Sequence, residues 1–436
     1  MSEQARPTAP TTKVPDLSVV HEVDAPRLTG RRVLVVGINY APEHTGIAPY
    51  TTQACEHFVK QGADVLVLSG VPHYPQWCVP DEYRWRRKVV EDHAGVQVRR
   101  LRHYVPSSQS AVRRGLYEAT FGVHALAERL PQRPDVVVAV VPSLLGAHAA
   151  ARIAKREGVP LVLWVQDLMG PAVAQSGIAG GGGRVSAATT RMEHALLKQA
   201  DRVFVLNEAF HAYVADAGVP VERIQILPNW THVRAPAADR ATTRQRLGWR
   251  PDEVIALHSG NMGLKQGLDN VVAAAQLAQR TGSCVRFVLM GDGNQRAVLE
   301  ELGHGVANLQ FLPPADSADF PDVLAAADVL LVNERATAVD MSLPSKLTSY
   351  FAAGMPVIAA VPGLGGTAQE VRRSGAGRLV TPEDAAALLD GVLELAADDD
   401  LLQVLRLAAS AHAHERLASA PSLALLAETV ADISVA

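Results

Sequence analysis

The sequence predicts an α/β protein of two domains, each with a parallel sheet that helices cover on both faces. Short, continuous runs of Val, Leu, Ile and Ala alternate with helical segments, and such runs are typical of strands buried on both sides. The 436 residues suffice for two large domains or about three smaller ones. The alternation pauses in a polar, Arg-rich stretch near residues 232–250 and then restarts, so we place the domain junction there.

The predicted elements follow from this pattern in chain order. Residues 1–30 predict a disordered leader. In the first domain we expect strands at residues 31–37, 64–68, 135–141, 160–165 and 202–206, and helices at residues 50–61, 144–156 and 185–199. In the second domain we expect strands at residues 254–257, 285–290, 329–332 and 357–360, with helices between them. We therefore assign residues 31–235 and 236–415 to the two domains, and residues 416–436 to a C-terminal helix that ends a helical tail.

Composition excludes several classes of protein. With 48% hydrophobic and 20% charged residues, the chain is neither disordered nor fibrous, and its net charge of −4 makes nucleic acid a poor partner. Cys55, Cys78 and Cys284 lie far apart without a C-x-x-C motif, which argues against disulfides or a zinc site and favours a reducing cytoplasm. The longest apolar stretch, residues 136–151, is too short and too broken to span a membrane. We expect a cytoplasmic protein, at most peripheral to the inner face of a membrane.

The strand ends direct the search for a site. Open parallel sheets bind ligands beyond the carboxyl ends of their strands, so two such domains predict a site in the cleft between them. After the first strand, Thr45 and Gly46 precede a helix, where backbone N–H groups suit an anion; the alternative is an ordinary glycine turn. Asp167 ends another strand, where it could orient a substrate hydroxyl or cap the next helix.

Two lysines in the second half of the chain suggest a phosphate site. Lys265 and Lys346 both lie in loops after predicted strands, and Lys346 opens a predicted helix. A compact ammonium group beside helix N–H groups suits a diphosphate, whereas the plain alternative is two solvated side chains. The turn that begins with Gly291 and Asp292 resembles the start of a dinucleotide fingerprint, but Arg296 stands where the third glycine belongs, which disfavours a dehydrogenase.

A basic and aromatic segment lies in the first domain. Arg84 to Lys88 are followed by Arg99 to Arg102 and then by Arg113 and Arg114. The segment is either a solvated face or a surface that attracts anionic lipid, with about 1 kcal/mol expected for each basic residue near a charged membrane.

A series of motifs resembles a known family. In chain order they are GINYAPE at 37–43, TGI at 45–47, YPQW at 74–77, VQD at 165–167, PNW at 228–230, SGN at 259–261, KQGL at 265–268, and LPSKL at 343–347 with AG at 353–354. Together they resemble the WcaI-like branch of retaining glycosyltransferase family four, whose namesake members are colanic-acid fucosyltransferases. The resemblance covers about residues 31–390.

The resemblance implies a GT-B type fold, in which two Rossmann-like parallel-sheet domains face a central cleft. It implies a nucleotide-diphosphate sugar donor on the C-terminal domain, a hydroxyl acceptor on the N-terminal domain, and retention at the anomeric carbon without a metal or other cofactor. The tail helix would cross back over the first domain. GDP- and UDP-sugars are the donors that the resemblance suggests.

The resemblance also implies roles for individual residues. The candidate catalytic residues are Lys265, Lys346, Gly46, Asp167 and Asp340. The candidate donor-binding residues are Gly260, Asn261, Gly291, Asp292, Ser342, Leu343, Pro344, Ser345 and Glu370. The candidate acceptor-binding residues are Asn39, Tyr40, Glu43, His44, Thr45, Tyr50, Tyr74, Trp77 and Gln166. Where the family has an arginine, a histidine and two glutamates, this chain has Asn261, Gln166, Met341 and Ser349, and Asp340 lies beside the first glutamate position.

The sequence leaves several functions open. We expect a hexosyltransferase of polysaccharide biosynthesis that acts on a lipid-linked or exopolysaccharide acceptor. The same activity on a small-molecule acceptor, a nucleotide-sugar epimerase, and a non-catalytic sugar-nucleotide binder are the alternatives. An epimerase would need a pair of carboxylates in the cleft, and the missing glutamates argue against it.

Overall fold

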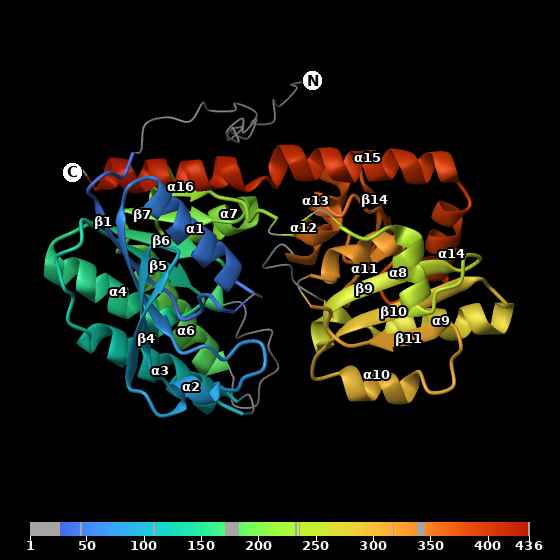
Figure 1. The fold of residues 1–436 in the computed structure, drawn as a ribbon, viewed down its shortest axis with the longest axis horizontal. Helices are drawn as coiled ribbons and strands as arrows, with labels where there is room; N and C mark the ends of the chain where they lie inside the picture. Colours follow the sequence, from blue (N-terminus) through green and yellow to red (C-terminus); the bar gives the residue numbers. More distant parts are fainter. Residues whose placement is uncertain are drawn as a thin grey trace, which may run out of the picture.

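The protein forms two parallel α/β sheets that lie side by side, with a helical tail along one edge of both (Figure 1). The computed structural model describes residues 27–43, 46–107, 110–170, 183–231, 233–234, 236–316, 318–337 and 345–434. None of the helices within these ranges is long and apolar enough to cross a membrane.

The first sheet has eight strands in the order β3-β4-β2-β1-β5-β6-β7-β8. These are β1 (Arg32–Val36), β2 (Asp64–Gly70), β3 (Lys88–His93), β4 (Val96–Leu101), β5 (Val136–Val141), β6 (Leu161–Val165), β7 (Arg202–Val205) and β8 (Ile224–Ile226). β3 is antiparallel to β4, and the other neighbouring strands are parallel. Its helices are α1 (Ala48–Lys60), α2 (Asp81–Arg84), α3 (Ala111–Ala127), α4 (Leu144–Glu157), α6 (Gly183–Leu197) and α7 (Glu208–Asp216), with the 3₁₀ turn η1 (Val221–Arg223).

The second sheet has six parallel strands in the order β11-β10-β9-β12-β13-β14. These are β9 (Val254–Asn261), β10 (Val285–Asp292), β11 (Leu309–Leu312), β12 (Val329–Asn333), β13 (Val357–Ala360) and β14 (Gly377–Val380). Its helices are α8 (Arg240–Leu247), α9 (Asp269–Thr281), α10 (Arg296–Leu302), α11 (Phe320–Ala326), α12 (Ser345–Ala352), α13 (Gly366–Ser374) and α14 (Ala385–Ala396), with the 3₁₀ turn η2 (Leu264–Gln266).

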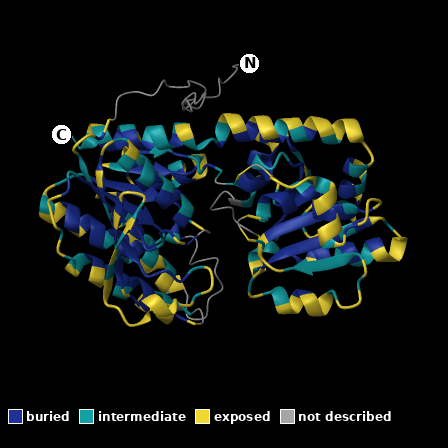
Figure 2. Cartoon of the chain, in the orientation of Figure 1, coloured by how far each residue is buried: buried dark blue, intermediate teal, exposed yellow. Residues whose placement is uncertain are grey.

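The central strands are buried because helices cover both faces of each sheet (Figure 2). Every residue of β5, β6 and β13 is buried, which explains their uninterrupted apolar sequences. Each sheet accordingly separates two hydrophobic clusters, one against each face. The site can only form beyond the strand ends, where the backbone leaves this core.

The tail connects the two lobes. α15 (Asp399–Arg416) packs on α12 beside the second sheet, and α16 (Ser419–Ile433) packs on α1 beside the first (Figure 1). Leu426 and Val430 of α16 belong to the same buried cluster as α1, whereas Ala409 of α15 belongs to a cluster of the second sheet. At the junction of the two helices, the Thr231 N–H donates to the Leu417 carbonyl at 2.8 Å.

The predicted fold class is confirmed, and each predicted strand begins within one residue of an observed one. The predictions missed β3, β4, β8, β11 and β14. β3 alternates exposed and half-buried residues and carries charges, so it lacks the continuous apolar run that marks a central strand. β8, β11 and β14 are short strands of three or four residues.

Two stretches expected to be irregular have ordered parts. Residues 240–247 of the predicted junction form α8, whose N-cap Asp239 accepts from the Thr242 N–H at 3.0 Å. Leu28 of the predicted leader is fully buried, and its N–H donates to the Gln61 carbonyl at 3.0 Å. The first domain therefore starts before residue 31.

Candidate functional site

The two lobes meet at the carboxyl ends of their strands. Asp167 follows β6 of the first sheet and interacts electrostatically with Lys265, which follows β9 of the second sheet. Nearby, the Tyr50 side chain of α1 interacts with Thr348 of α12. Functional groups of both lobes therefore face each other where open parallel sheets bind ligands.

Lys346 and Lys265 form a cationic pair on the second lobe. The Lys346 ammonium lies 3.5 Å from Nε2 of His258, which is fully buried in β9. The pKa of Lys346 is lowered to about 8, chiefly by burial; the Glu334 carboxylate opposes this shift, and the Lys265 charge contributes to it. Burial, followed by the Lys346 charge, also lowers the pKa of His258 well below its usual value, so the imidazole is neutral.

The Lys265 loop is held in place by residues that follow β12. The Asn333 side chain, which is 1% exposed, donates to the carbonyls of Gln266 at 2.7 Å and Gly267 at 2.8 Å. The Arg335 N–H donates to the Lys265 carbonyl at 3.0 Å. Lys265 therefore has a fixed backbone, as a group that binds a phosphate requires.

The residues that support both lysines are not among those predicted from the sequence. His258, Asn333 and Glu334 lie in β9 or at the end of β12. A polar residue within an otherwise apolar strand, or just beyond its carboxyl end, is the signal that could have identified them.

The glycine turns beside Lys265 and Lys346 are tightly packed. Gly260 and Gly291 have φ angles of +116° and +143°, in the region that favours glycine. A Cβ atom on Gly291 would lie 1.9 Å from the Gly260 carbonyl oxygen. Asn261 and Asp292, at the ends of the two strands, are exposed beside this contact. The two strand ends therefore turn in close contact with each other.

Replacing Gly291 with alanine should destabilise the second lobe, because the new methyl group meets backbone that cannot move aside. We expect a loss of at least about 2 kcal/mol in the free energy of unfolding, measured by denaturant titration. Gly282→Ala is the control: its φ is +64°, and its Cβ would have no neighbour within 4 Å. Equal losses in both variants would show that the contact with Gly260 does not matter.

Glu43 and Asn39 support the first-lobe loop rather than face an acceptor. The Glu43 carboxylate is 7% exposed and accepts from the N–H groups of His73 and Tyr74, each at 2.8 Å. It also accepts from the Asn39 amide at 2.8 Å. The predicted acceptor role of Glu43 is therefore corrected to one of holding two loops together. Gly46 is exposed with a φ of +65°, and its Cβ would lie 3.3 Å from the Tyr74 ring.

Two predicted acceptor residues are buried. Tyr40 is 1% exposed and packs beneath the Arg100 guanidinium, 5.7 Å from the ring centroid. Tyr50 is 2% exposed, packs edge-on against Trp230 at 5.4 Å, and interacts with Thr348 of the other lobe. Neither ring is open to an acceptor, which corrects both predictions: Tyr40 is a core residue and Tyr50 a contact between the lobes.

Gln166 and Asp167 lie at the end of β6 as predicted. Gln166 is 5% exposed, and its side-chain oxygen accepts from Asn229 at 2.8 Å. Burial raises the pKa of Asp167 to about 6, although the Leu168 N–H and the Lys265 charge oppose this. Asp167 is therefore ionised at neutral pH and faces the cationic pair.

Glu370 does not face a ligand. Its carboxylate is 7% exposed and accepts from Nε2 of His412 in α15 at 2.6 Å and from Arg373 at 3.1 Å. Burial raises the pKa of Glu370, but the hydrogen bond and charge of His412 outweigh this and lower it below its usual value. Both oxygens are engaged within the domain, so the predicted donor-binding role of Glu370 is corrected to the packing of α13 on α15.

Several predicted site residues lie outside the described residues. These are His44, Thr45, Asp340, Met341, Ser342, Leu343 and Pro344. Ser345 begins α12.

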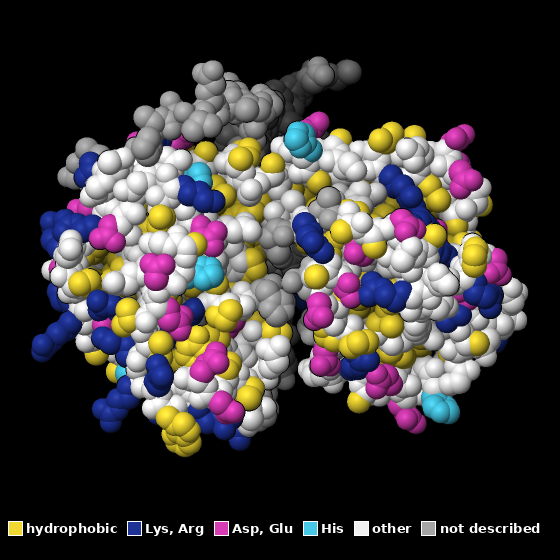
Figure 3. All heavy atoms as spheres, in the orientation of Figure 1, with side chains coloured by type: hydrophobic (Ala, Val, Ile, Leu, Met, Phe, Trp, Pro, Cys, Tyr) yellow, Lys and Arg dark blue, Asp and Glu magenta, His cyan; other side chains and the backbone are white. Residues whose placement is uncertain are grey.

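The predicted basic surface is smaller than expected. Arg100 is 2% exposed and pairs with Glu91 at 3.0 Å, whereas Arg99 and Lys88 both pair with Glu128. Arg84, Arg86, Arg87 and Arg102 remain exposed. Basic and hydrophobic side chains gather at the lower edge of the first lobe, where α2 and α3 lie (Figures 1 and 3).

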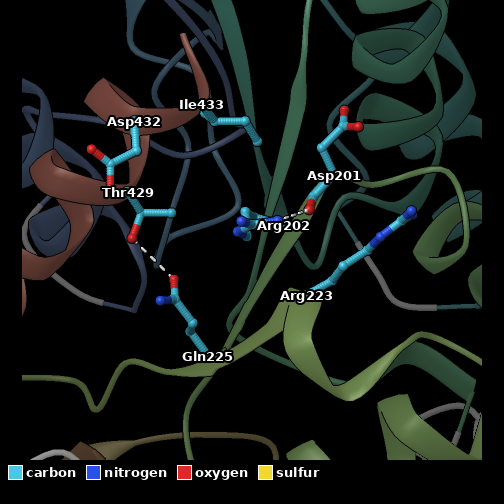
Figure 4. Close-up of a pocket in the computed structure, with 7 residues that line it drawn as sticks. All are labelled: Asp201, Arg202, Arg223, Gln225, Thr429, Asp432 and Ile433. Carbon is cyan, nitrogen blue, oxygen red and sulfur yellow. Dashed lines mark hydrogen bonds between the residues drawn. The ribbon is translucent and has the colours of Figure 1, made fainter. Parts of the chain in front are cut away.

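A separate cavity of about 370 Å³ lies away from the carboxyl ends of the strands (Figure 4). It lies at the amino ends of β7 and β8 against α16, and Thr429 of α16 donates to Gln225 at 3.0 Å. Its lining includes two arginines and two aspartates, Arg202, Arg223, Asp201 and Asp432. Its charges are balanced, and it lies at the amino ends of the strands, whereas open parallel sheets bind ligands at the carboxyl ends. This cavity is therefore not the centre of the site.

Comparisons with known proteins agree with this geometry. Residues 45–230 match the model of the glycosyl transferase 4-like domain, and residues 239–412 match that of glycosyl transferases group 1. The chain is 35% identical over 335 residues to WcaI of Escherichia coli (strain K12), which is described as a glycosyl transferase of colanic acid biosynthesis. The match covers 74% of this chain and 81% of that protein.

Solved structures share the fold. Sucrose-phosphate synthase from Thermosynechococcus elongatus superposes with a TM-score of 0.72 at 18% identity, covering 93% of this chain and 99% of that one. Anabaena HepE in complex with UDP-glucose superposes with a TM-score of 0.66 at 18% identity, covering 92% and 99%. The two facing parallel sheets are thus of the GT-B type, and the chain belongs to the group 1 glycosyltransferases of family four.

Proposed function

We propose that the protein transfers a hexose from a nucleotide-diphosphate sugar to a hydroxyl acceptor, with retention at the anomeric carbon. The observation that carries this proposal is the pair of lysines on the second lobe. Lys346 and Lys265 interact with each other at the carboxyl ends of parallel strands, beside the tight turn of Gly260 and Gly291. A glycosyltransferase needs fixed positive charge at this place, because a diphosphate leaves the sugar.

The chemistry follows from where charge develops. Breaking the bond between sugar and phosphate concentrates negative charge on the departing diphosphate, and Lys265 and Lys346 are placed to stabilise it. The exposed Gly46 would bring backbone N–H groups of the first lobe to the same diphosphate. The leaving phosphate oxygen would accept the proton of the acceptor hydroxyl as the new glycosidic bond forms. Asp167, which follows β6, would orient the acceptor hydroxyl during this step.

The proposal assigns the donor to the second lobe and the acceptor to the first. HepE, which has the same fold, is known in complex with UDP-glucose, and WcaI is described as a transferase of colanic acid biosynthesis. Both support a nucleotide-sugar donor and a saccharide product. The exposed arginines near α2 favour an acceptor at the surface of a membrane over a small soluble acceptor.

The alternative is a protein of the same fold that binds sugar nucleotides without transfer. It is suggested by Ser349, which is 6% exposed in α12, where the family resemblance leads one to expect a glutamate. Such a protein would bind the donor and show no turnover with any acceptor or with water.

A thermal-shift panel of UDP, GDP, ADP, dTDP and NADPH tests the proposal. A ligand at about 100 times its dissociation constant adds about 2.7 kcal/mol to the free energy of unfolding. We expect one nucleoside diphosphate to raise the melting temperature well above the others. A shift with NADPH alone would contradict the proposal and favour a dinucleotide site at the Gly291 turn.

A further inference from the structure

A second cavity, of about 500 Å³, lies in the first lobe between the end of β4, α2 and α3. Its wall is largely apolar and aromatic: Val71, Trp77, Val79, Tyr83, Tyr104 and Val105. None of the roles assigned above, apart from that of Trp77, uses these residues. The cavity can therefore hold a group that is not the sugar nucleotide.

Basic side chains surround the mouth of this cavity. Arg84 and Arg102 belong to its lining, and Arg86 and Arg87 are exposed next to it in the chain. In the described part of the chain, Arg84 pairs with Asp81, whereas Arg86, Arg87 and Arg102 have no carboxylate partner. The mouth therefore favours an anion, and the apolar wall behind it favours hydrocarbon.

Exposed apolar side chains continue this surface outward. Trp85 is 81% exposed directly after α2, and Leu116 and Val123 of α3 are 49% and 63% exposed. Figure 3 shows hydrophobic and basic side chains together along this edge of the lobe. Large apolar residues interleaved with arginines are typical of a surface that meets lipid, where the polar groups bind phosphate.

Trp77 connects the cavity with the catalytic cleft. Trp77 lines the cavity, and the centroid of its ring lies 5.6 Å from that of Tyr117 and 6.1 Å from that of Tyr74. Tyr74 in turn lies against Gly46, the candidate phosphate-binding glycine. Trp77 has a φ of +52°, an unusual conformation for a bulky residue, of the kind that tends to occur at binding sites.

We propose that this cavity binds the phosphate and the first hydrocarbon units of a lipid-linked acceptor. The inference rests on the proposed function and specifies its acceptor class. The arginines meet the phosphate, the apolar wall meets the hydrocarbon, and the saccharide passes Trp77 and Tyr74 to reach the cleft. The exposed Trp85, Leu116 and Val123 place the cavity mouth against the bilayer from which such an acceptor extends.

Binding of farnesyl diphosphate, a soluble lipid diphosphate, tests the proposal by calorimetry. We expect the full-length protein to bind it at least about tenfold more tightly than inorganic diphosphate or farnesol, because one ligand satisfies both halves of the cavity. A saturating nucleoside diphosphate should leave this affinity unchanged. Displacement by the nucleotide would overturn the proposal, since the lipid would then occupy the donor site.

Two variants and one control localise the binding. Arg102→Gln and Trp77→Leu should each weaken farnesyl diphosphate binding about five- to tenfold, as expected for loss of one charged or aromatic contact. Arg280→Gln, the same charge change on an exposed residue of α9, should have no effect. Wild-type affinity in both cavity variants would contradict the proposal. Both variants should bind the nucleoside diphosphate as tightly as the wild type does. If the wild type itself binds no nucleoside diphosphate, that result contradicts the proposed function and not the role of this cavity.

Vesicles distinguish the source of the phosphate. If phosphatidylglycerol vesicles bind in an Arg102-dependent way while farnesyl diphosphate does not, the surface serves bilayer phospholipid and the proposed acceptor role is wrong. If both bind, and vesicles do not displace farnesyl diphosphate from the cavity, the acceptor role is supported.

Discussion

Replacing Lys346 with methionine should lower kcat/KM for transfer about 10- to 150-fold. In the proposed function the Lys346 ammonium group would donate a charged hydrogen bond to the departing diphosphate, and such a bond contributes about 1.5–3 kcal/mol. Donor affinity should fall as well, because the same charge would contact the phosphates of the bound nucleotide. Steady-state kinetics and calorimetry with the preferred nucleoside diphosphate measure the two effects.

The fold should tolerate this change. Methionine keeps most of the volume and removes a charge that burial disfavours, as the lowered pKa of Lys346 shows. Losing the cation beside Glu334 acts in the opposite direction. We therefore expect the melting temperature to move by only a few degrees, which is about 1 kcal/mol. Lys155→Met, at an exposed position of α4, should change neither activity nor affinity. Unchanged nucleotide affinity in Lys346→Met would disprove the phosphate role.

The affinity for the nucleoside diphosphate should weaken as the pH rises above 8. Only the ammonium form of Lys346 attracts phosphate, and its pKa in the free protein is about 8. Because a single proton is involved, the dissociation constant should rise about tenfold per pH unit until the proton is also lost from the complex. Calorimetry in several buffers should detect proton uptake on binding in this range. The Lys346→Met variant should lack both the uptake and most of the pH dependence.

The contribution of Lys346 to the stability of the free protein should increase as the pH rises, whereas the nucleotide affinity decreases. The folded pKa of about 8 lies below the ordinary value of 10.5, so between these values the unfolded state binds more protons. The contribution of Lys346 to the free energy of unfolding therefore increases with pH across this window and is constant below it. Comparing wild-type and Lys346→Met unfolding at pH 7.5 and 10 isolates this contribution. A wild-type stability that fell relative to the variant would contradict the assignment.

The strands of the two sheets could be predicted from the sequence better than the residues that hold the candidate site in place. The inner strands could be predicted because burial on both faces leaves an uninterrupted apolar run, as in β5 and β6. The cleft lysines could be predicted because they follow such strands. The roles of Glu43 and Glu370 depend on partners 30 and 42 residues away, and that of Lys346 on His258, 88 residues away. A local sequence pattern does not reveal a partner so far away in the chain. In the sequence, an acidic residue that holds loops together therefore looks the same as one that binds a substrate.

The contact between Thr231 and Leu417 has a consequence for how the lobes move. The chain crosses from one lobe to the other near residue 231 and returns where α15 meets α16, and this hydrogen bond joins the two crossings. A second bond, from Ser422 to the Pro228 carbonyl at 3.2 Å, reinforces the same place. The two lobes are therefore connected along one edge by a hinge of two chain segments, which these hydrogen bonds join. Opening and closing of the lobes is then a rotation about this hinge. A single proteolytic cut in either segment leaves the two lobes connected by the other segment.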